Sequence, residues 1–148
     1  MVAFASSGFP AASLRGGYRR ADVELHRVDL AVPSYEGRVF LDRPDADRDT
    51  PLDAEHGYLG SFFVFGKVEC WGEDEEHCAE PTTRPFDHRR PSNRYAKIRV
   101  RIPDGVLERL VSRAGDELTL QVVPVVAGGE APAGDILRFD RLSIITYA

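Results

Sequence analysis

Hydrophobic and polar residues alternate along much of the chain, which is the pattern of strands that bury one face. In the segment from Asp22 to Val32 the apolar residues Val23, Leu25, Val28 and Leu30 are interspersed with charged ones. The segment from Arg94 to Ile102 alternates strictly, with Lys and Arg on its other face. Because successive side chains of a strand point to opposite faces of a sheet, both segments are predicted to be half-buried strands. The charged face of 94–102 favours an edge or half-solvated strand.

Four further segments have the composition of strands. They cover residues 37–42, 59–69, 117–126 and 136–147. The second of them is apolar at consecutive positions, so both of its faces are predicted to be covered, with Phe62, Phe63 and Phe65 in the core. Pro124 indicates a bulge or a sheet edge in segment 117–126, and a break in alternation at Asp140 indicates a bulge in segment 136–147.

A single segment, 103–114, has the period of a helix. Its apolar residues form one stripe, with proline near the start and glycine after the end. About six to eight strands with one short helix predict an all-β fold, an antiparallel β-sandwich or jelly roll. Residues 1–18 are predicted to be a lead-in or linker, and residues 19–148 a single β-sandwich domain.

The balance of acidic and basic residues limits the classes of partner that the chain could bind. Lys and Arg number 19 against 24 Asp and Glu, a net charge of −5 that argues against a nucleic-acid-binding protein. The chain has no apolar run that could span a membrane and no pattern of an export signal, so no membrane contact is expected. Two cysteines are compatible with free thiols in a reducing compartment, which predicts a cytoplasmic location. A single disulfide between them is the alternative.

The longest irregular segment, 70–93, contains the most reactive residue types. Cys70 and Cys78 are either bridged into a small loop or free thiols in a structural loop. A third alternative is a metal site formed by Cys70, His77, Cys78 and His88, with His56 nearby. The two cysteines do not have the close spacing of the cysteine pairs in zinc sites. This favours a structural loop that shapes a contact surface over a metal centre.

The motifs of the common catalytic sites are absent. The sequence contains no nucleophile elbow, phosphate-binding loop, dinucleotide-binding glycine pattern or helical zinc-binding motif. Asp45, Asp47 and Asp49 have the spacing of a calcium loop, but Thr50 stands where that loop needs glycine, which favours a turn capped by its own carboxylates. We therefore expect a non-catalytic protein with no cofactor.

Three motifs resemble the C-terminal β-domain of bacterial tyrosinase-family (type 3 copper) proteins and, more distantly, of plant polyphenol oxidases. They are Gly-Ser-Phe-Phe-Val-Phe-Gly at 60–66, Cys-Trp-Gly…His-Cys at 70–78 and Leu-Arg-Phe-Asp…Ser-Ile-Ile-Thr-Tyr at 137–147. In that family the β-domain packs over a four-helix bundle whose six histidines hold two copper ions. This chain has four histidines in all. The resemblance therefore implies the accessory domain without the oxidase.

What the resemblance implies is a domain that docks on a separately encoded tyrosinase-like copper oxidase and shields its site or assists its folding or copper loading. We expect Trp71 and Phe86 to contact the partner, with Arg89, Arg90 and Arg94 as a charged rim. Trp71 has a second interpretation, as a cover over the end of the core. Two other functions stay open: a small metal-binding protein or metalloenzyme, and a self-assembling β-protein or homo-oligomer that associates through strand edges.

Overall fold

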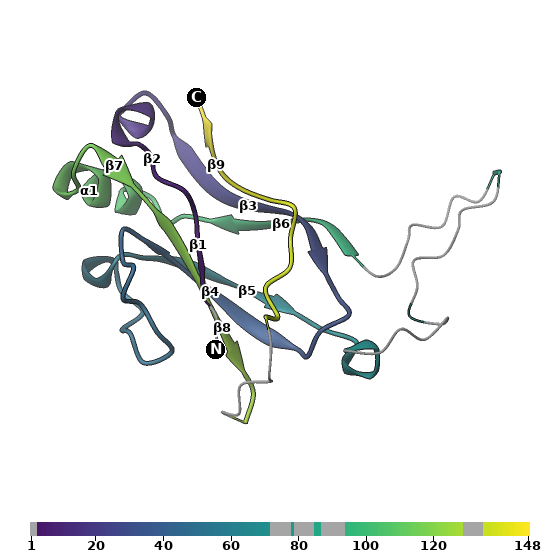
Figure 1. Cartoon of the computed structure of the whole chain (residues 1–148). Helices are drawn as coiled ribbons and strands as arrows, with labels where there is room; N and C mark the ends of the chain where they lie inside the picture. Colours follow the sequence, from purple (N-terminus) through teal and green to yellow (C-terminus); the bar gives the residue numbers. More distant parts are fainter. Residues whose placement is uncertain (1–2, 72–77, 79–84, 87–93, 129–134) are drawn as a thin grey trace.

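The computed structural model describes residues 3–71, 78, 85–86, 94–128 and 135–148. Strands dominate the regular structure in this part of the chain, and they form three antiparallel sheets (Figure 1). The predicted all-β fold with one short helix is confirmed.

Two larger sheets and one short strand pair make up the structure. The larger sheet has the strand order β1 (Phe4–Ala5), β8 (Leu120–Val126), β4 (Tyr35–Leu41) and β5 (Tyr58–Val64). The second sheet has the order β6 (Arg94–Arg101), β3 (Arg20–Asp29) and β9 (Arg141–Tyr147). The short pair joins β2 (Phe9–Pro10) and β7 (Glu117–Leu118). Strands β5 and β6 therefore each lie at the edge of their sheet.

One hydrophobic core lies between the two larger sheets, as in a β-sandwich. Val23 and Leu25 enter it from β3, and Val39, Leu59 and Val122 enter it from the other sheet; all five are fully buried. The alternation in segment 22–32 therefore identified the inward face of β3 correctly.

A smaller core covers part of the outer face of the larger sheet. Phe40 of β4 points away from the main core and packs with Ala46 and Val123. The ring of Tyr58 lies 5.6 Å from that of Phe40. Because Ala46 belongs to the loop between β4 and β5, this cluster holds the loop against the sheet.

The one α-helix described, α1, covers Val106–Arg113. It begins later than predicted because Gly105, at φ 76°, adopts a left-handed conformation in front of its first turn. Val106, Leu107 and Val111 are buried, which confirms the predicted apolar stripe. Three 3₁₀ helices complete the described elements: η1 (Ala11–Leu14), η2 (Ala54–His56) and η3 (Val68–Cys70).

The N-terminal segment is not the loose lead-in that the sequence predicts. Phe4 pairs with Val122 of β8, and Phe9 pairs with Leu118 of β7. Ala11 and Leu14 of η1 are buried in the main core. These apolar residues are too few for a recognisable alternation, but long-range pairing incorporates them into the domain.

The last strand is shorter than the predicted segment 136–147. It begins at Arg141, which is the place where the alternation breaks. Just before it, the backbone N–H of Asp140 donates to the carbonyl of His26 at 2.9 Å. The break therefore marks the point at which the chain joins the edge of the three-stranded sheet.

Candidate functional site

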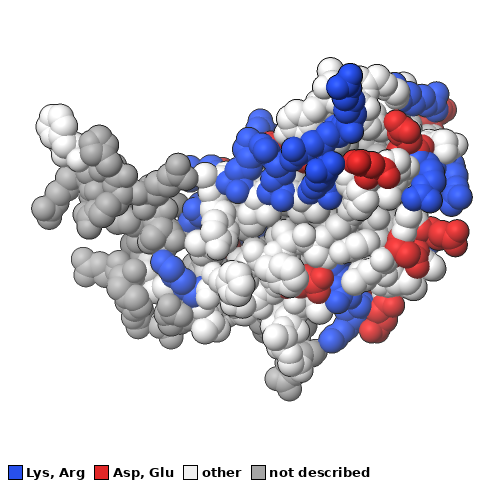
Figure 2. All heavy atoms as spheres, turned by 180° about the vertical axis from the view of Figure 1, so that it is seen from behind, with Lys and Arg blue, Asp and Glu red and all other residues white. Residues whose placement is uncertain are grey.

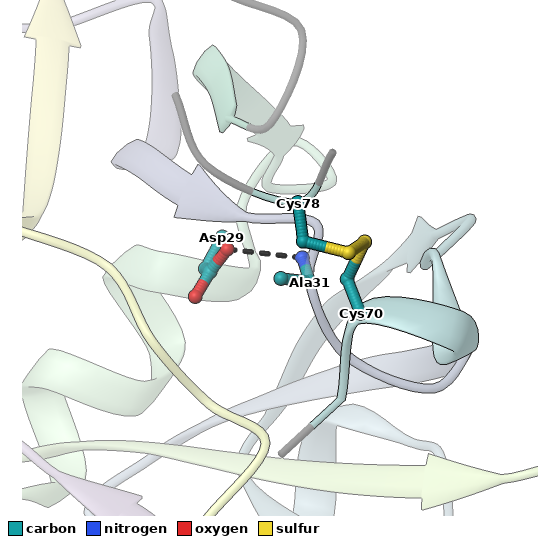
Figure 3. The surroundings of a disulfide bond; sticks show 4 residues. All are labelled: Asp29, Ala31, Cys70 and Cys78. Carbon is teal, nitrogen blue, oxygen red and sulfur yellow. Dashed lines mark hydrogen bonds between the residues drawn. A yellow bond between two sulfur atoms is a disulfide. The ribbon is translucent and has the colours of Figure 1, made fainter. Parts of the chain in front are cut away.

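A disulfide joins Cys70 and Cys78 in the segment after β5 (Figure 3). The two Cα atoms lie 5.4 Å apart, and Cys70 is buried. Of the alternatives that the sequence left open, the structure contains the bridge. Since both sulfurs are bonded to each other, neither is a thiolate, and the predicted metal set of Cys70, His77, Cys78 and His88 lacks two of its four ligands. His77 and His88 lie outside the described residues.

The disulfide also bears on the predicted location. Disulfides persist in oxidising compartments and are rare in the reducing cytosol. The bond between Cys70 and Cys78 therefore does not support the cytoplasmic location inferred from the cysteine count. The cytoplasmic location stays a prediction.

The disulfide lies beside the connection between β3 and β4 (Figure 3). In that connection a side-chain oxygen of Asp29 accepts a hydrogen bond from the backbone N–H of Ala31 at 3.0 Å. Lys67, three residues before Cys70, donates its backbone N–H to the carbonyl of Leu30 at 2.6 Å. The residues that lead to the disulfide are thus hydrogen-bonded to the connection between β3 and β4.

We expect the bridge to contribute about 2.5 kcal/mol to the free energy of unfolding, because it closes a loop with a sequence separation of 8. The Cys70→Ser/Cys78→Ser variant should lose that amount in urea denaturation. Wild-type protein measured with a thiol reductant is the matched control and should lose the same amount. Two free thiols in unreduced, unfolded protein would contradict the bridge. Stabilisation of the reduced protein by zinc would favour the metal site instead.

Trp71 follows the first cysteine and is half-buried. Its indole packs against the main core, and the guanidinium of Arg138 lies 5.0 Å from the centre of the ring. This packing agrees with a cover over the end of the core, and the predicted partner contact of Trp71 stays a prediction.

The other predicted contact residues fall only partly within the described chain. Phe86 is 93% exposed. Arg94, the first residue of β6, forms an ion pair with Asp140 at 3.2 Å. Arg89 and Arg90 lie outside the described residues. The arginine rim therefore stays a prediction.

An apolar hollow that the sequence did not indicate lies at one end of the larger sheet. Phe63 and Phe65 are 63% and 75% exposed, so their predicted place in the core is wrong; Phe62 alone of the three is buried. The hollow has a volume of about 310 Å³. We call it the aromatic hollow; it is lined by Ser34, Tyr35, Glu36, Phe63, Val64, Phe65, Val125, Val126 and Ala127.

The strand geometry explains why Phe62 and Phe63 differ. Phe62 points inward and meets the ring of Tyr35 edge-on, with 6.1 Å between the ring centres. Its ring also occupies the place where a side chain at Gly37 would lie, so glycine is needed there. Phe63 points to the outer face, opposite Glu36. Because apolar residues stand at consecutive positions of β5, hydrophobicity alone could not separate these two rings.

Two carboxylates lie buried on the outer face of the three-stranded sheet. Asp22 and Glu24 are 0% and 4% exposed. Arg20 donates to both oxygens of Asp22, at 2.8 and 2.6 Å, and this hydrogen bonding holds the pKa of Asp22 below its usual value. Glu24 accepts two bonds from Arg99, at 3.0 and 2.8 Å, and lies 3.2 Å from Lys97. Burial raises the pKa of Glu24, but hydrogen bonds from Lys97 and Arg99 outweigh burial and lower it.

No metal-binding cluster is present among the described residues. In that part of the chain no group of three or more His, Cys, Asp and Glu side chains is placed to hold a metal ion. His56 bonds Asp53 at 2.7 Å on the exposed surface, where Asp53 caps η2. Asp47 accepts hydrogen bonds from Asp49 and Thr50, the capped turn that the sequence favoured over a calcium loop.

A second cavity, of about 290 Å³, lies between β9 and the N-terminal segment. Its lining is apolar apart from serine hydroxyls: Ser6, Ser7, Phe9, Ser13, Leu14, Leu120, Leu142, Ser143 and Ile144. No lining residue carries a carboxylate, imidazole, amine or thiol, so this cavity offers no group for acid–base or metal chemistry.

Comparison of the chain with protein-family models, with curated proteins and with solved structures returns no match. Among the described residues no helix has both the length and the apolar character that a membrane crossing requires.

Proposed function

We propose that this chain is a non-catalytic docking domain that binds a separately encoded tyrosinase-like copper oxidase. The observation that carries the proposal is the aromatic hollow, where two phenylalanine side chains are more than half exposed. Large contiguous apolar patches are uncommon on proteins that act alone, and aromatic residues are enriched where proteins meet. Burial of Phe63 and Phe65 against the partner would supply the apolar part of the contact.

The sequence motifs support the choice of partner. The segments 60–66, 70–78 and 137–147 resemble the β-domain that covers the copper site in tyrosinase-family proteins. The first of these segments contains both exposed rings of the aromatic hollow. The docked domain would shield the site of the oxidase or assist its folding or copper loading.

The surroundings of the hollow favour docking with little rearrangement. Phe62, the neighbour of Phe63 in β5, is packed in the core. Gly66 donates its backbone N–H to the hydroxyl of Ser34 at 3.0 Å, which ties the end of β5 to the start of β4. A surface held in its binding shape loses less conformational entropy when it binds.

The test is calorimetric titration of this protein into a bacterial tyrosinase-family catalytic bundle that is expressed without its own β-domain. We expect a saturable complex and a lower rate of diphenol oxidation by the bundle. The variant Phe63→Ser/Phe65→Ser should weaken the complex about thirtyfold, a loss of about 2 kcal/mol for two truncated contact residues.

Leu52→Ser is the matched control, because Leu52 is also an exposed apolar residue but lies in the loop between β4 and β5. This variant should bind within about twofold of the wild type. Absence of a complex with the bundle would refute the choice of partner. Equal binding by the Phe63→Ser/Phe65→Ser variant would refute the hollow as the contact surface.

A further inference from the structure

The outer face of the three-stranded sheet gathers positive charge. We call it the cationic face; it consists of Arg20 of β3, Lys97, Arg99 and Arg101 of β6, and Arg141 of β9. The strand register places Arg101 opposite Asp22 and Arg99 opposite Glu24, so these side chains share one face. Figure 2 shows Lys and Arg side chains gathered in a band on the side of the molecule that is seen from behind.

The negative charge on this face is hidden beneath the positive charge. The side chains of Arg20, Lys97 and Arg99 are 40%, 43% and 45% exposed, whereas the carboxylates of Asp22 and Glu24 below them are buried. Arg101 is more exposed, at 60%, and forms an ion pair with the exposed Asp104 at 3.3 Å. A molecule that approaches this face therefore meets cations, although the chain has a net charge of −5.

The buried carboxylates also hold the cations in place. Arg20 is bonded to both oxygens of Asp22, and Arg99 gives Nε and Nη2 to one oxygen of Glu24. A guanidinium has five N–H donors, so a bound arginine keeps donors for a second acceptor. Because these side chains are already ordered, a ligand that binds them causes little further loss of side-chain entropy.

The spacing of the cations points to the form of the ligand. Lys97, Arg99 and Arg101 alternate with the inward Ile98 and Val100 along β6. Alternate residues of a strand are about 6.6–6.8 Å apart, and an extended polypeptide with an acid at every second position repeats its carboxylates at the same distance. We propose that the cationic face binds an extended acidic segment of a partner protein, with alternate Asp or Glu side chains against these three cations.

The same face is less suited to nucleic acid. Proteins that bind single strands combine cations with exposed aromatic rings on which bases stack. The ring of Tyr147 on this face is covered by the guanidinium of Arg20, 5.2 Å from its centre. This leaves Tyr95, which is 38% exposed, as the single aromatic residue of β6 on which a base could stack. The net charge of −5 also opposes binding of a densely charged phosphate backbone. An extended polypeptide segment whose separate carboxylates repeat at the spacing of the cations fits the face better.

The experiment uses the whole chain and a fluorescent peptide of five Glu-Thr repeats, with binding followed by anisotropy. A second peptide carries the same number of glutamates, but at every third position. We expect the alternating peptide to bind, the second to bind at least about fivefold more weakly, and a rise from about 0.05 M to about 0.5 M salt to abolish both signals. The Lys97→Gln/Arg101→Gln variant should weaken binding of the alternating peptide about tenfold.

The control variant is Arg109→Gln/Arg113→Gln, which removes the same charge from exposed positions of α1 and should bind within about twofold of the wild type. If the first variant fails to fold, Arg101→Gln alone replaces it, with an expected loss of about threefold. Equal binding of both peptides, or equal weakening by both variants, would overturn the proposal. Tighter binding of a thymidine oligonucleotide than of the alternating peptide would also overturn it, in favour of a nucleic-acid site. The docking test with the copper oxidase bundle is independent of these outcomes.

Discussion

Replacing Phe40 by alanine is expected to lower the free energy of unfolding by about 3–5 kcal/mol. Phe40 is fully buried on the outer face of the larger sheet, where it packs with Ala46 and Val123 and lies beside the ring of Tyr58. Loss of the ring removes its apolar burial and leaves a cavity that the sheet cannot close, because β4 is paired on both sides. The loop that contains Ala46 would also lose its main apolar contact.

Urea denaturation of the Phe40→Ala variant measures this loss, and hydrogen exchange of residues 42–57 measures the release of the loop. The matched control is Phe63→Ala, the same substitution at a position of the same sheet that is 63% exposed. It should change the free energy of unfolding by less than about 0.5 kcal/mol. A loss below about 1 kcal/mol for Phe40→Ala would show that the loop does not cover this ring in solution.

The substitution Gly66→Ala is expected to lower the free energy of unfolding by about 3 kcal/mol. A Cβ atom at Gly66 would collide with the backbone carbonyl oxygen of Val32, which cannot rotate away as a side chain could. Relief of the collision would separate the two segments and break two hydrogen bonds, from Gly66 to the hydroxyl of Ser34 and from Lys67 to the carbonyl of Leu30. Each of these bonds contributes about 1 kcal/mol.

The control for Gly66→Ala is Gly115→Ala, because a Cβ atom at Gly115 meets nothing within 4 Å. This control should unfold within about 0.5 kcal/mol of the wild type in urea. Gly66→Ala should also weaken docking through the aromatic hollow, since Phe65 is its neighbour in the chain. Unchanged stability of Gly66→Ala would show that the two segments are not in contact in solution.

The periodicity of the sequence was sufficient to predict the main strands and the helix. In the segments 22–32 and 94–102 the alternation identified the inward residues Val23, Leu25 and Val100, since side chains alternate across a strand whatever surrounds it. The stripe in α1 was equally visible, because the helical period is also a property of the backbone. The sequence could not show whether Cys70 and Cys78 are bonded, because this depends on how closely the fold brings them together.

Long-range contacts determine which side chains on the outer faces of the two sheets are covered and which are exposed. Phe40 and Phe63 both point outward from the larger sheet, yet the loop that contains Ala46 covers the first, while the second is exposed in the aromatic hollow. In the other sheet, side chains of β6 bury the outward Glu24 and leave cations at the surface. The sequence by itself determined the face to which each side chain points. Only the tertiary structure determined which outward faces are covered, because the covering residues come from distant parts of the chain.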